Sequence, residues 1–428
     1  MISCDNVLRV KQLFEGAIKL KVFFMKNKKI IRETLHRIKL IFMRSIANTR
    51  LRKIAKIKTK SPIIKVGYIV QMAEIWDKEA PVFDKMLADE RFDPYLIVVP
   101  AYDFVKSEIQ DYGEELAFFL YNYGNERIVR AYEHEKWLDL RSFSFDYIFF
   151  QRCWEGYMPH QYRTREVVKY AKTCYIPYGI GGIKYDKIFY ETSFFTSLYI
   201  NFCSSQEQVD LQNNNKYKKN VYLGIPVLDN NDNNSINCND KKRLLWTPRW
   251  TEDPFYGGSS FFTYKDKILE FKKIYPDVEL ILRPHPMTFE NAIRTGRMTK
   301  DEVTRYKEKV QEYGVVFDKN EQVGVTFKQT SILITDYSSI ILEYFLSEKP
   351  VIYCTDINIS LSETYKYISK GFYVVKNWDE LELQVNKLIN GEDELKDVRT
   401  NLVKKLKQQN KGAINKIIEF IVNDSCPL

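Results

Sequence analysis

Two short motifs, RPHP and TDYSS, carry side chains suited to binding phosphate groups. RPHP places Arg283 two residues before His285, and TDYSS places Asp336 ahead of Ser338 and Ser339. Arginine offers a planar fork of donors that matches phosphate oxygens, and histidine and serine can donate to the same oxygens. These residue types at this spacing predict an anion site, and a diphosphate is the simplest ligand for it.

A third motif, WTPRW, adds Arg249 to this set, although that guanidinium could instead stack on Trp246 or Trp250. The chain has no GxxxxGK[ST] loop and no DxD pair at a strand end. We therefore expect protein donors to hold the diphosphate, with no metal and no cofactor.

Each motif follows a short apolar run of strand type. SILI precedes TDYSS, the helically spaced IILEYFL follows it, and KPVIYC comes next as a second buried strand. Strand, helix and strand in that order predict a parallel pair, and ligands of such sheets bind at the carboxyl ends of the strands. Two structural alternatives stay open: Asp336, Ser338 and Ser339 could only cap a buried helix, and His285 could be structural.

The same alternation of strand and helix fills the chain in two parts. Residues 61–229 form one predicted unit and residues 243–428 the other, with the polar stretch 230–242 as linker. The predicted fold class is α/β, with two doubly wound Rossmann-like domains facing a cleft. The helices near 378–391 and 395–423 look structural, or return across the cleft onto the first domain.

A glycine-containing stretch, YIPYGIGG, follows a predicted strand of the first unit. Gly179, Gly181 and Gly182 would permit close approach of the backbone to a ligand, here the acceptor. Without further support, the same stretch could equally be a plain loop.

Charge separates the amino-terminal segment from the rest. Residues 1–60 contain 17 basic and three acidic residues, a net charge of +14; since the whole chain carries +9, the remainder carries −5. Seven scattered cysteines without CxxC spacing and only four histidines argue against zinc and for reduced thiols in the cytoplasm.

The segment 1–60 is predicted to be a basic amphipathic arm. Ile31, Leu35, Ile38, Phe42 and Ile46 follow helical spacing, with basic residues largely between them. No apolar run is long enough to span a bilayer, and no secretory signal is recognised. We expect peripheral attachment to the cytoplasmic face of the membrane. The alternatives are that this helix docks on the body of the protein or that the arm binds nucleic acid.

WTPRW, RPHP and TDYSSIILEYFLSEKPVIYC, in this order, resemble the carboxyl-terminal half of the CDP-glycerol glycerophosphotransferase family of teichoic-acid and capsule polymerases. The resemblance is specific over about 243–356 and looser over 61–229. It implies the two-domain glycosyltransferase B fold, with His285, Ser338 and Ser339 holding the donor diphosphate beside Arg283. Glu343 takes the place of the family's aspartate near the nucleotide ribose.

The first half departs from the family at the residue assigned as the catalytic base. Where family members have a histidine before glycine, this chain has Tyr178, a poor base near neutral pH because its ordinary pKa is about 10. Glu155 and His160 are possible substitutes near strand ends, and Tyr178 could only orient the acceptor.

The expected function is transfer of glycerol phosphate, or a related polyol phosphate, from a CDP-activated donor to a hydroxyl of a lipid-linked or glycan polymer acceptor. The expected setting is cell-envelope polysaccharide or teichoic-acid-like synthesis. The first alternative is a glycosyltransferase of the same fold using a nucleotide sugar. The second is a non-catalytic protein that binds membrane or nucleic acid; the negative body argues against nucleic acid as a partner.

Overall fold

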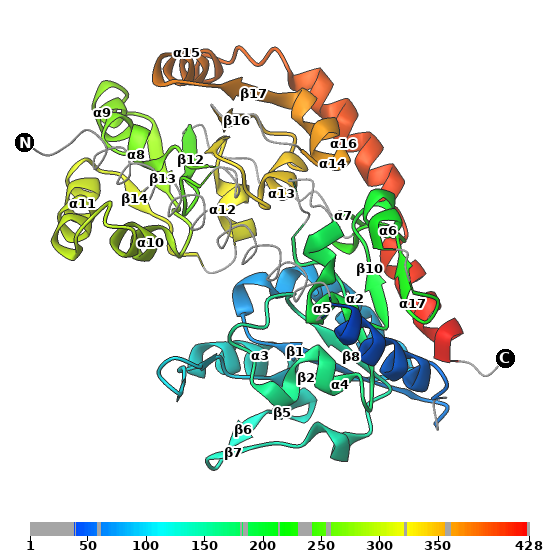
Figure 1. The fold of residues 1–428 in the computed structure, drawn as a ribbon. Helices are drawn as coiled ribbons and strands as arrows, with labels where there is room; N and C mark the ends of the chain where they lie inside the picture. Colours follow the sequence, from blue (N-terminus) through cyan, green and yellow to red (C-terminus); the bar gives the residue numbers. More distant parts are fainter. Residues whose placement is uncertain are drawn as a thin grey trace, which may run out of the picture.

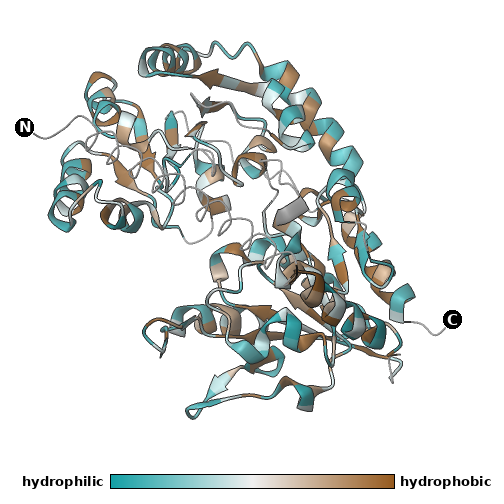
Figure 2. Cartoon of the chain, in the orientation of Figure 1, coloured by the Kyte–Doolittle hydropathy of each residue, from teal (hydrophilic) through white to brown (hydrophobic). Residues whose placement is uncertain are grey.

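Two parallel β-sheets organise the chain into two halves (Figure 1). The computed structural model describes residues 38, 40–57, 61–179, 182, 187–212, 215–229, 242–253, 258–320, 323–355 and 361–425. The predicted linker therefore lies almost wholly outside the described residues, as do Gly181 and most of the arm. Figure 2 shows the apolar strands at the centre of each half and hydrophilic outer faces on the helices around them.

The first half is built on a seven-stranded sheet of order β11-β10-β9-β8-β1-β2-β5. Its strands are β1 (Ile64–Val70), β2 (Phe92–Val98), β5 (Ile128–Arg130), β8 (Tyr147–Phe150), β9 (Lys172–Tyr175), β10 (Ile200–Phe202) and β11 (Lys219–Val221). Two small hairpins lie beside it, β3 (Tyr102–Asp103) with β4 (Glu108–Ile109) and β6 (Tyr132–Glu133) with β7 (Lys136–Trp137).

Short helices connect these strands. They are η1 (Ala73–Lys78), α2 (Ala80–Leu87), α3 (Gly113–Tyr123), η2 (Asn125–Arg127), η3 (Leu140–Phe143), η4 (His160–Tyr162), α4 (Thr164–Val167), η5 (Lys187–Glu191), α5 (Ser193–Thr196), α6 (Gln206–Gln212) and α7 (Pro226–Asp229). The continuous apolar sequence of the strands is explained by their burial, since β1 and β8 are covered on both faces.

The second half is built on a six-stranded sheet of order β14-β13-β12-β15-β16-β17. Its strands are β12 (Arg243–Thr247), β13 (Glu279–Leu282), β14 (Val316–Phe317), β15 (Ile332–Thr335), β16 (Val351–Cys354) and β17 (Phe372–Val375). Its helices are α8 (Phe261–Tyr264), α9 (Lys267–Ile274), α10 (Thr288–Arg294), α11 (Lys300–Glu312), α12 (Val323–Gln329), α13 (Ile341–Phe345), α14 (Glu363–Ile368), η7 (Ser369–Gly371) and α15 (Trp378–Ile389).

The last two helices return to the first half, the second of the two arrangements expected for them. α16 (Lys396–Asn410) ends before Gly412, whose φ of 78° permits the bend, and α17 (Ala413–Ser425) then packs on the first half (Figure 1). Near its end, the buried Asp424 carboxylate accepts hydrogen bonds from Tyr147 Oη (2.6 Å) and Lys172 Nζ (2.7 Å). The carboxyl-terminal helices therefore connect the two halves.

The described part of the arm, residues 40–54, forms a helix docked on the first half. Ala47, Leu51 and Ile54 are buried there, whereas Ile41 and Phe42 are 65% and 67% exposed. The docking alternative is thus correct for the carboxyl-terminal part of this helix, and its earlier turns present apolar side chains to the surface. Within the described ranges, no helix combines the length and apolar character needed to cross a bilayer.

Candidate active site

Parallel register brings the three predicted motifs to one edge of the second sheet. Trp246 pairs with Leu282 on one side of β12, and Thr247 pairs with Thr335 on the other. The chain leaves all three strands at this carboxyl edge, where Arg249, Arg283 and Asp336 follow directly. The strand-end argument from the sequence is therefore correct.

Asp336 is a buried residue that positions the backbone at this edge. It is only 1% exposed, and its Oδ2 accepts hydrogen bonds from the backbone N–H groups of Arg249 (2.9 Å) and Ser260 (3.0 Å). Burial raises the pKa of Asp336, and these hydrogen bonds oppose the shift. Its carboxylate thus fixes the loop after β12.

Arg249 stacks on a different ring from the two proposed by sequence. Its guanidinium lies 4.7 Å from the ring centroid of Tyr337, and Nη1 donates to the Tyr337 carbonyl at 2.8 Å. Neither Trp246 nor Trp250 is the stacking partner. The arginine is thereby held beside the TDYSS turn.

Arg283 and His285 lie on the loop after β13. Arg283 Nη1 donates to Asp318 Oδ2 and to the Asn320 carbonyl, both at 2.6 Å, so one side of its fork is fixed. His285 is exposed at the surface, yet the partial loss of surrounding water and then the Arg249 charge lower the pKa of His285 to about 4. His285 is therefore a neutral imidazole at neutral pH.

The tautomer of His285 follows from its neighbour. The backbone N–H of Met287 donates to Nδ1 at 3.2 Å, so the ring proton lies on Nε2. A neutral histidine in this tautomer is a hydrogen-bond donor through Nε2.

Ser338 and Ser339 precede a helix that is shorter than the sequence indicates. α13 spans only Ile341–Phe345, so the contribution of a helix dipole is small and the hydroxyl groups matter more. Among the described residues, Ser338 Oγ makes only a long contact of 3.4 Å with the Ile340 N–H, and Tyr365 Oη fixes the turn by donating to the Ser338 carbonyl at 2.9 Å.

The glycine-containing loop of the first half reaches this turn. The N–H of Gly182 donates to Tyr337 Oη at 2.8 Å, and its carbonyl accepts from the Ser362 N–H at 2.7 Å. A Cβ atom on Gly179 would lie 3.2 Å from the Cβ of Ser339. The structure therefore brings Gly179, Gly182 and the serine pair together.

Tyr178 is unsuited to act as the base. Burial, followed by the nearby Cys153, raises the pKa of Tyr178 further above its ordinary value of about 10. The phenol is neutral at neutral pH, which leaves an orienting role for this residue.

The two substitutes for the base are engaged within the first half. Glu155 Oε1 accepts from the N–H (2.6 Å) and Oγ1 (3.0 Å) of Thr164 at the start of α4. His160 is exposed and packs edge-on against Phe104, with ring centroids 5.4 Å apart. Glu155 thus acts as a helix cap, and burial raises its pKa despite the two Thr164 bonds.

Two site residues were missed by sequence reasoning, and both lie on η1 directly after β1. Lys78 forms an ion pair with Glu343, so the residue expected near the ribose is paired across the two halves. Glu74 interacts electrostatically with Arg283 of the second half; burial raises the pKa of Glu74, and Arg283 opposes this shift. The strand-end argument applied to β1 would have found this helix.

Comparison with known proteins supports the motif-based resemblance. Residues 214–423 match the family described as CDP-glycerol:poly(glycerophosphate) glycerophosphotransferase, a stretch that contains all the second-half site residues. The teichoic acid poly(glycerol phosphate) polymerase of Bacillus spizizenii (strain ATCC 23059 / NRRL B-14472 / W23) is 29% identical over 137 residues, 31% of this chain and 30% of that protein. The chain thus aligns with less than a third of that relative.

Solved structures share the fold at low identity. The wall teichoic acid polymerase TagF superposes with a TM-score of 0.54 at 12% identity, covering 92% of this chain and 97% of TagF. The UDP-GlcNAc 2-epimerase from Neisseria meningitidis, bound to UDP-GlcNAc, gives 0.55 at 12% identity, covering 84% and 100%. The predicted glycosyltransferase B arrangement of two Rossmann-like units is confirmed.

Proposed function

We propose that the chain transfers glycerol phosphate, or a related polyol phosphate, from a CDP-activated donor to a hydroxyl of a polymer acceptor. The observation that carries this proposal is the gathering of Arg249, Arg283, His285 and the serine pair at one sheet edge, within the stretch that matches the glycerophosphotransferase family. The setting is synthesis of a teichoic-acid-like or capsule polymer of the cell envelope.

In the reaction, an acceptor oxygen attacks the β-phosphorus of the donor and CMP leaves. The bond between the β-phosphorus and the bridging oxygen breaks as the new phosphodiester forms. Arg283, His285 Nε2–H and the hydroxyls of Ser338 and Ser339 donate to the phosphate oxygens and stabilise the charge that develops on them. Asp336 and Tyr337 position Arg249 at the same sheet edge.

Glu74 is the base that accepts the acceptor's proton. It lies on η1 at the carboxyl edge of the first sheet, interacts with Arg283 of the donor site, and accepts no hydrogen bond from any described residue. Burial raises its pKa toward the working pH, which makes it a stronger base than an exposed glutamate. Tyr178 orients the acceptor hydroxyl.

Product analysis separates this reaction from its nearest rival. Incubation with CDP-glycerol and a polyol-phosphate acceptor is expected to release one CMP per glycerol phosphate added. Release of a nucleoside diphosphate from a nucleotide sugar, without CMP release, would instead support a glycosyltransferase.

The arm places the enzyme at the cytoplasmic face of the membrane, where lipid-linked acceptors would be made. Support comes from the +14 charge of residues 1–60 and from the exposed Ile38, Ile41 and Phe42 on its helix. If removal of residues 1–58 left flotation with anionic vesicles unchanged, this part of the proposal would be wrong.

A further inference from the structure

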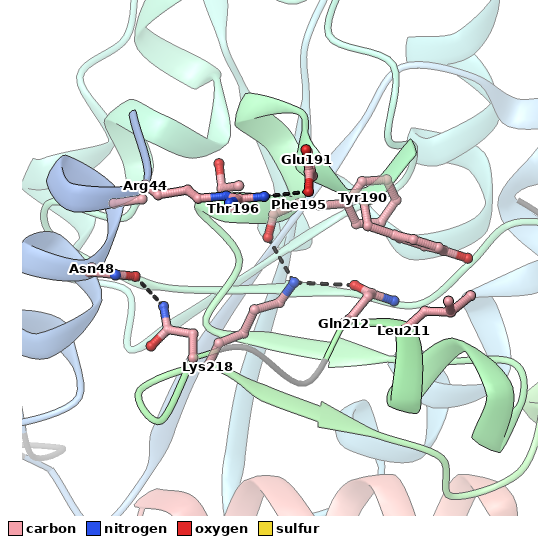
Figure 3. Close-up of a pocket in the computed structure, with 11 residues that line it drawn as sticks. Arg44, Asn48, Tyr190, Glu191, Phe195, Thr196, Leu211, Gln212 and Lys218 are labelled. Carbon is pink, nitrogen blue, oxygen red and sulfur yellow. Dashed lines mark hydrogen bonds and ion pairs between the residues drawn. The ribbon is translucent and has the colours of Figure 1, made fainter. Parts of the chain in front are cut away.

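A cavity of about 90 Å³ lies between the arm helix and the first half (Figure 3). Arg44, Ala47 and Asn48 line it from the arm, and Lys218 is among the residues that line it from the body. Two contacts hold the arm in place beside it: Arg44 pairs with Glu191, and Asn48 contacts Asn215. The cavity is too small for a nucleotide, because pockets for whole small molecules usually enclose about 300 Å³ or more.

The Glu191 carboxylate also lines the cavity and is paired with Arg44, which leaves Lys218 as the cation without a carboxylate partner among the described residues. Its Nζ donates to the Phe195 carbonyl at 2.8 Å and to Gln212 Oε1 at 3.2 Å, and Figure 3 shows the nitrogen between these two groups. An ammonium has three N–H donors, so one remains for a ligand. Burial lowers the pKa of Lys218 to about 8, which leaves it mainly charged at neutral pH, and a bound anion would raise this pKa again.

The other walls are partly apolar. Ala47, Tyr190, Phe195 and Leu211 contribute carbon surface beside the Lys218 ammonium. The ligand that suits such a lining has an anionic group of phosphate size attached to an apolar remainder that extends outside.

The position of the cavity on the arm fits such a molecule. Ile41 and Phe42 are exposed on the same helix, and Asn48 lies about 9 Å along the axis from Phe42 at 1.5 Å per residue. An interfacial helix lies in the plane of the membrane surface, with its apolar side chains at the boundary between headgroups and acyl chains. Arg44, which lines the cavity, follows Phe42 by two residues on this helix, so insertion of Ile41 and Phe42 would bring lipid headgroups close to the cavity.

We propose that this cavity is a binding site for the phosphate headgroup of an anionic membrane lipid, with Lys218 as its principal contact. The proposal rests on the membrane attachment proposed above and is independent of the transfer reaction. It gives the arm a specific lipid contact in addition to its general positive charge.

The test is flotation of the full-length protein with phosphatidylcholine vesicles that do or do not contain phosphatidylglycerol, comparing Lys218→Gln with Lys216→Gln. Lys216 is an exposed lysine two residues away and loses the same charge. At 1 M salt, where the Debye length is about 3 Å, the effect of an exposed charge is screened. We expect K218Q to weaken binding about tenfold under these conditions, as for loss of a charge-assisted hydrogen bond, and K216Q to match wild type.

A second variant covers the outcome in which K218Q fails to fold. Ala47→Leu fills the cavity without changing charge and should reduce the phosphatidylglycerol-dependent binding to a similar extent. Soluble glycerol phosphate should not compete with the lipid for binding. Equal binding by wild type, K218Q and A47L would overturn the headgroup site while leaving membrane attachment standing. Absence of vesicle binding by wild type would overturn both, and CDP-glycerol titration would still report on the donor site.

Discussion

The N–H of Gly182 donates to Tyr337 Oη at 2.8 Å, so a loop of the first half is bound directly to the turn that carries Ser338 and Ser339. Acceptor-side and donor-side elements thus meet at a hydrogen bond. The cleft predicted between the two halves is closed at this point by backbone and tyrosine contacts.

Gly182→Ala should uncouple these elements. The new Cβ atom would lie 2.5 Å from Tyr337 Cε2 and 2.6 Å from the Tyr365 ring, so the loop or the tyrosines must move. Overpacking of this kind costs about 1–3 kcal/mol, and displacement of the serine turn should lower transfer by at least about tenfold. Thermal unfolding and CMP release measure the two effects. Gly156→Ala, where a Cβ would meet nothing within 4 Å, is the matched control and should behave as wild type.

The ion pair between Lys78 and Glu343 should contribute strongly to the closed arrangement. Both side chains are largely buried, with 9% and 15% exposure. Removing one partner of a buried pair leaves an unpaired charge and typically costs about 3–5 kcal/mol. We expect Lys78→Met to destabilise the protein by about this amount and Lys78→Met/Glu343→Leu by less, as measured by denaturant unfolding. Additive effects in this cycle would show that the pair is not coupled.

Glu79 should make stability depend on pH. It is fully buried, its two carboxylate oxygens have no hydrogen-bond partner in the described structure, and burial raises its pKa well above the ordinary value. The folded state therefore keeps the proton that the unfolded chain loses near pH 4.3. The stability contributed by the protonated form is complete below that pH and is lost as the pH rises toward the raised pKa. Wild type should lose stability relative to Glu79→Gln as the pH rises above the ordinary pKa of a glutamate; parallel pH profiles would contradict this assignment.

Glu74→Gln should reveal the base through the pH profile. Because the pKa of Glu74 is raised, kcat/KM of wild type should fall as the pH drops through this raised value, where the carboxylate becomes protonated. The pH profile of the variant should lack this fall in kcat/KM. Its rate should be lower by about 100-fold or more, with unchanged CDP-glycerol affinity.

Glu115→Gln is the control for the Glu74 variant. Glu115 raises the pKa of Glu74 by charge repulsion. Its removal should therefore move the low-pH fall in kcat/KM to lower pH, while the maximal rate stays nearly that of wild type. An unshifted fall in kcat/KM in Glu115→Gln, together with an active Glu74→Gln variant, would exclude Glu74 as the base.

The donor side could be predicted from sequence because its geometry is local. Each of Arg249, Arg283 and Asp336 follows a recognisable strand, and parallel strands necessarily place their carboxyl ends together. The role of each residue at that edge could not be predicted in the same way. Asp336 accepts hydrogen bonds from Arg249 and Ser260, which are far from it in the sequence, and it thereby holds the loop after β12.

The acceptor side depends on contacts that no local pattern encodes. Nothing in the stretch around Glu155 indicates that Thr164 occupies its carboxylate; the strand-end argument leads to the helix after β1, but only the interaction with Arg283 singles out Glu74 on it. Strands β5, β10 and β17 of the two sheets were also missed. β10 is only three residues long, and β17 lies between two helical patterns.

The most direct test is CMP release by His285→Ala with CDP-glycerol and an acceptor, alongside wild type and with folding checked by thermal unfolding. Loss of a positioned donor to the transferring phosphate should reduce transfer by about 100-fold or more while the protein remains folded. A folded variant that releases CMP within about threefold of the wild-type rate would contradict the assignment of this sheet edge as the donor site.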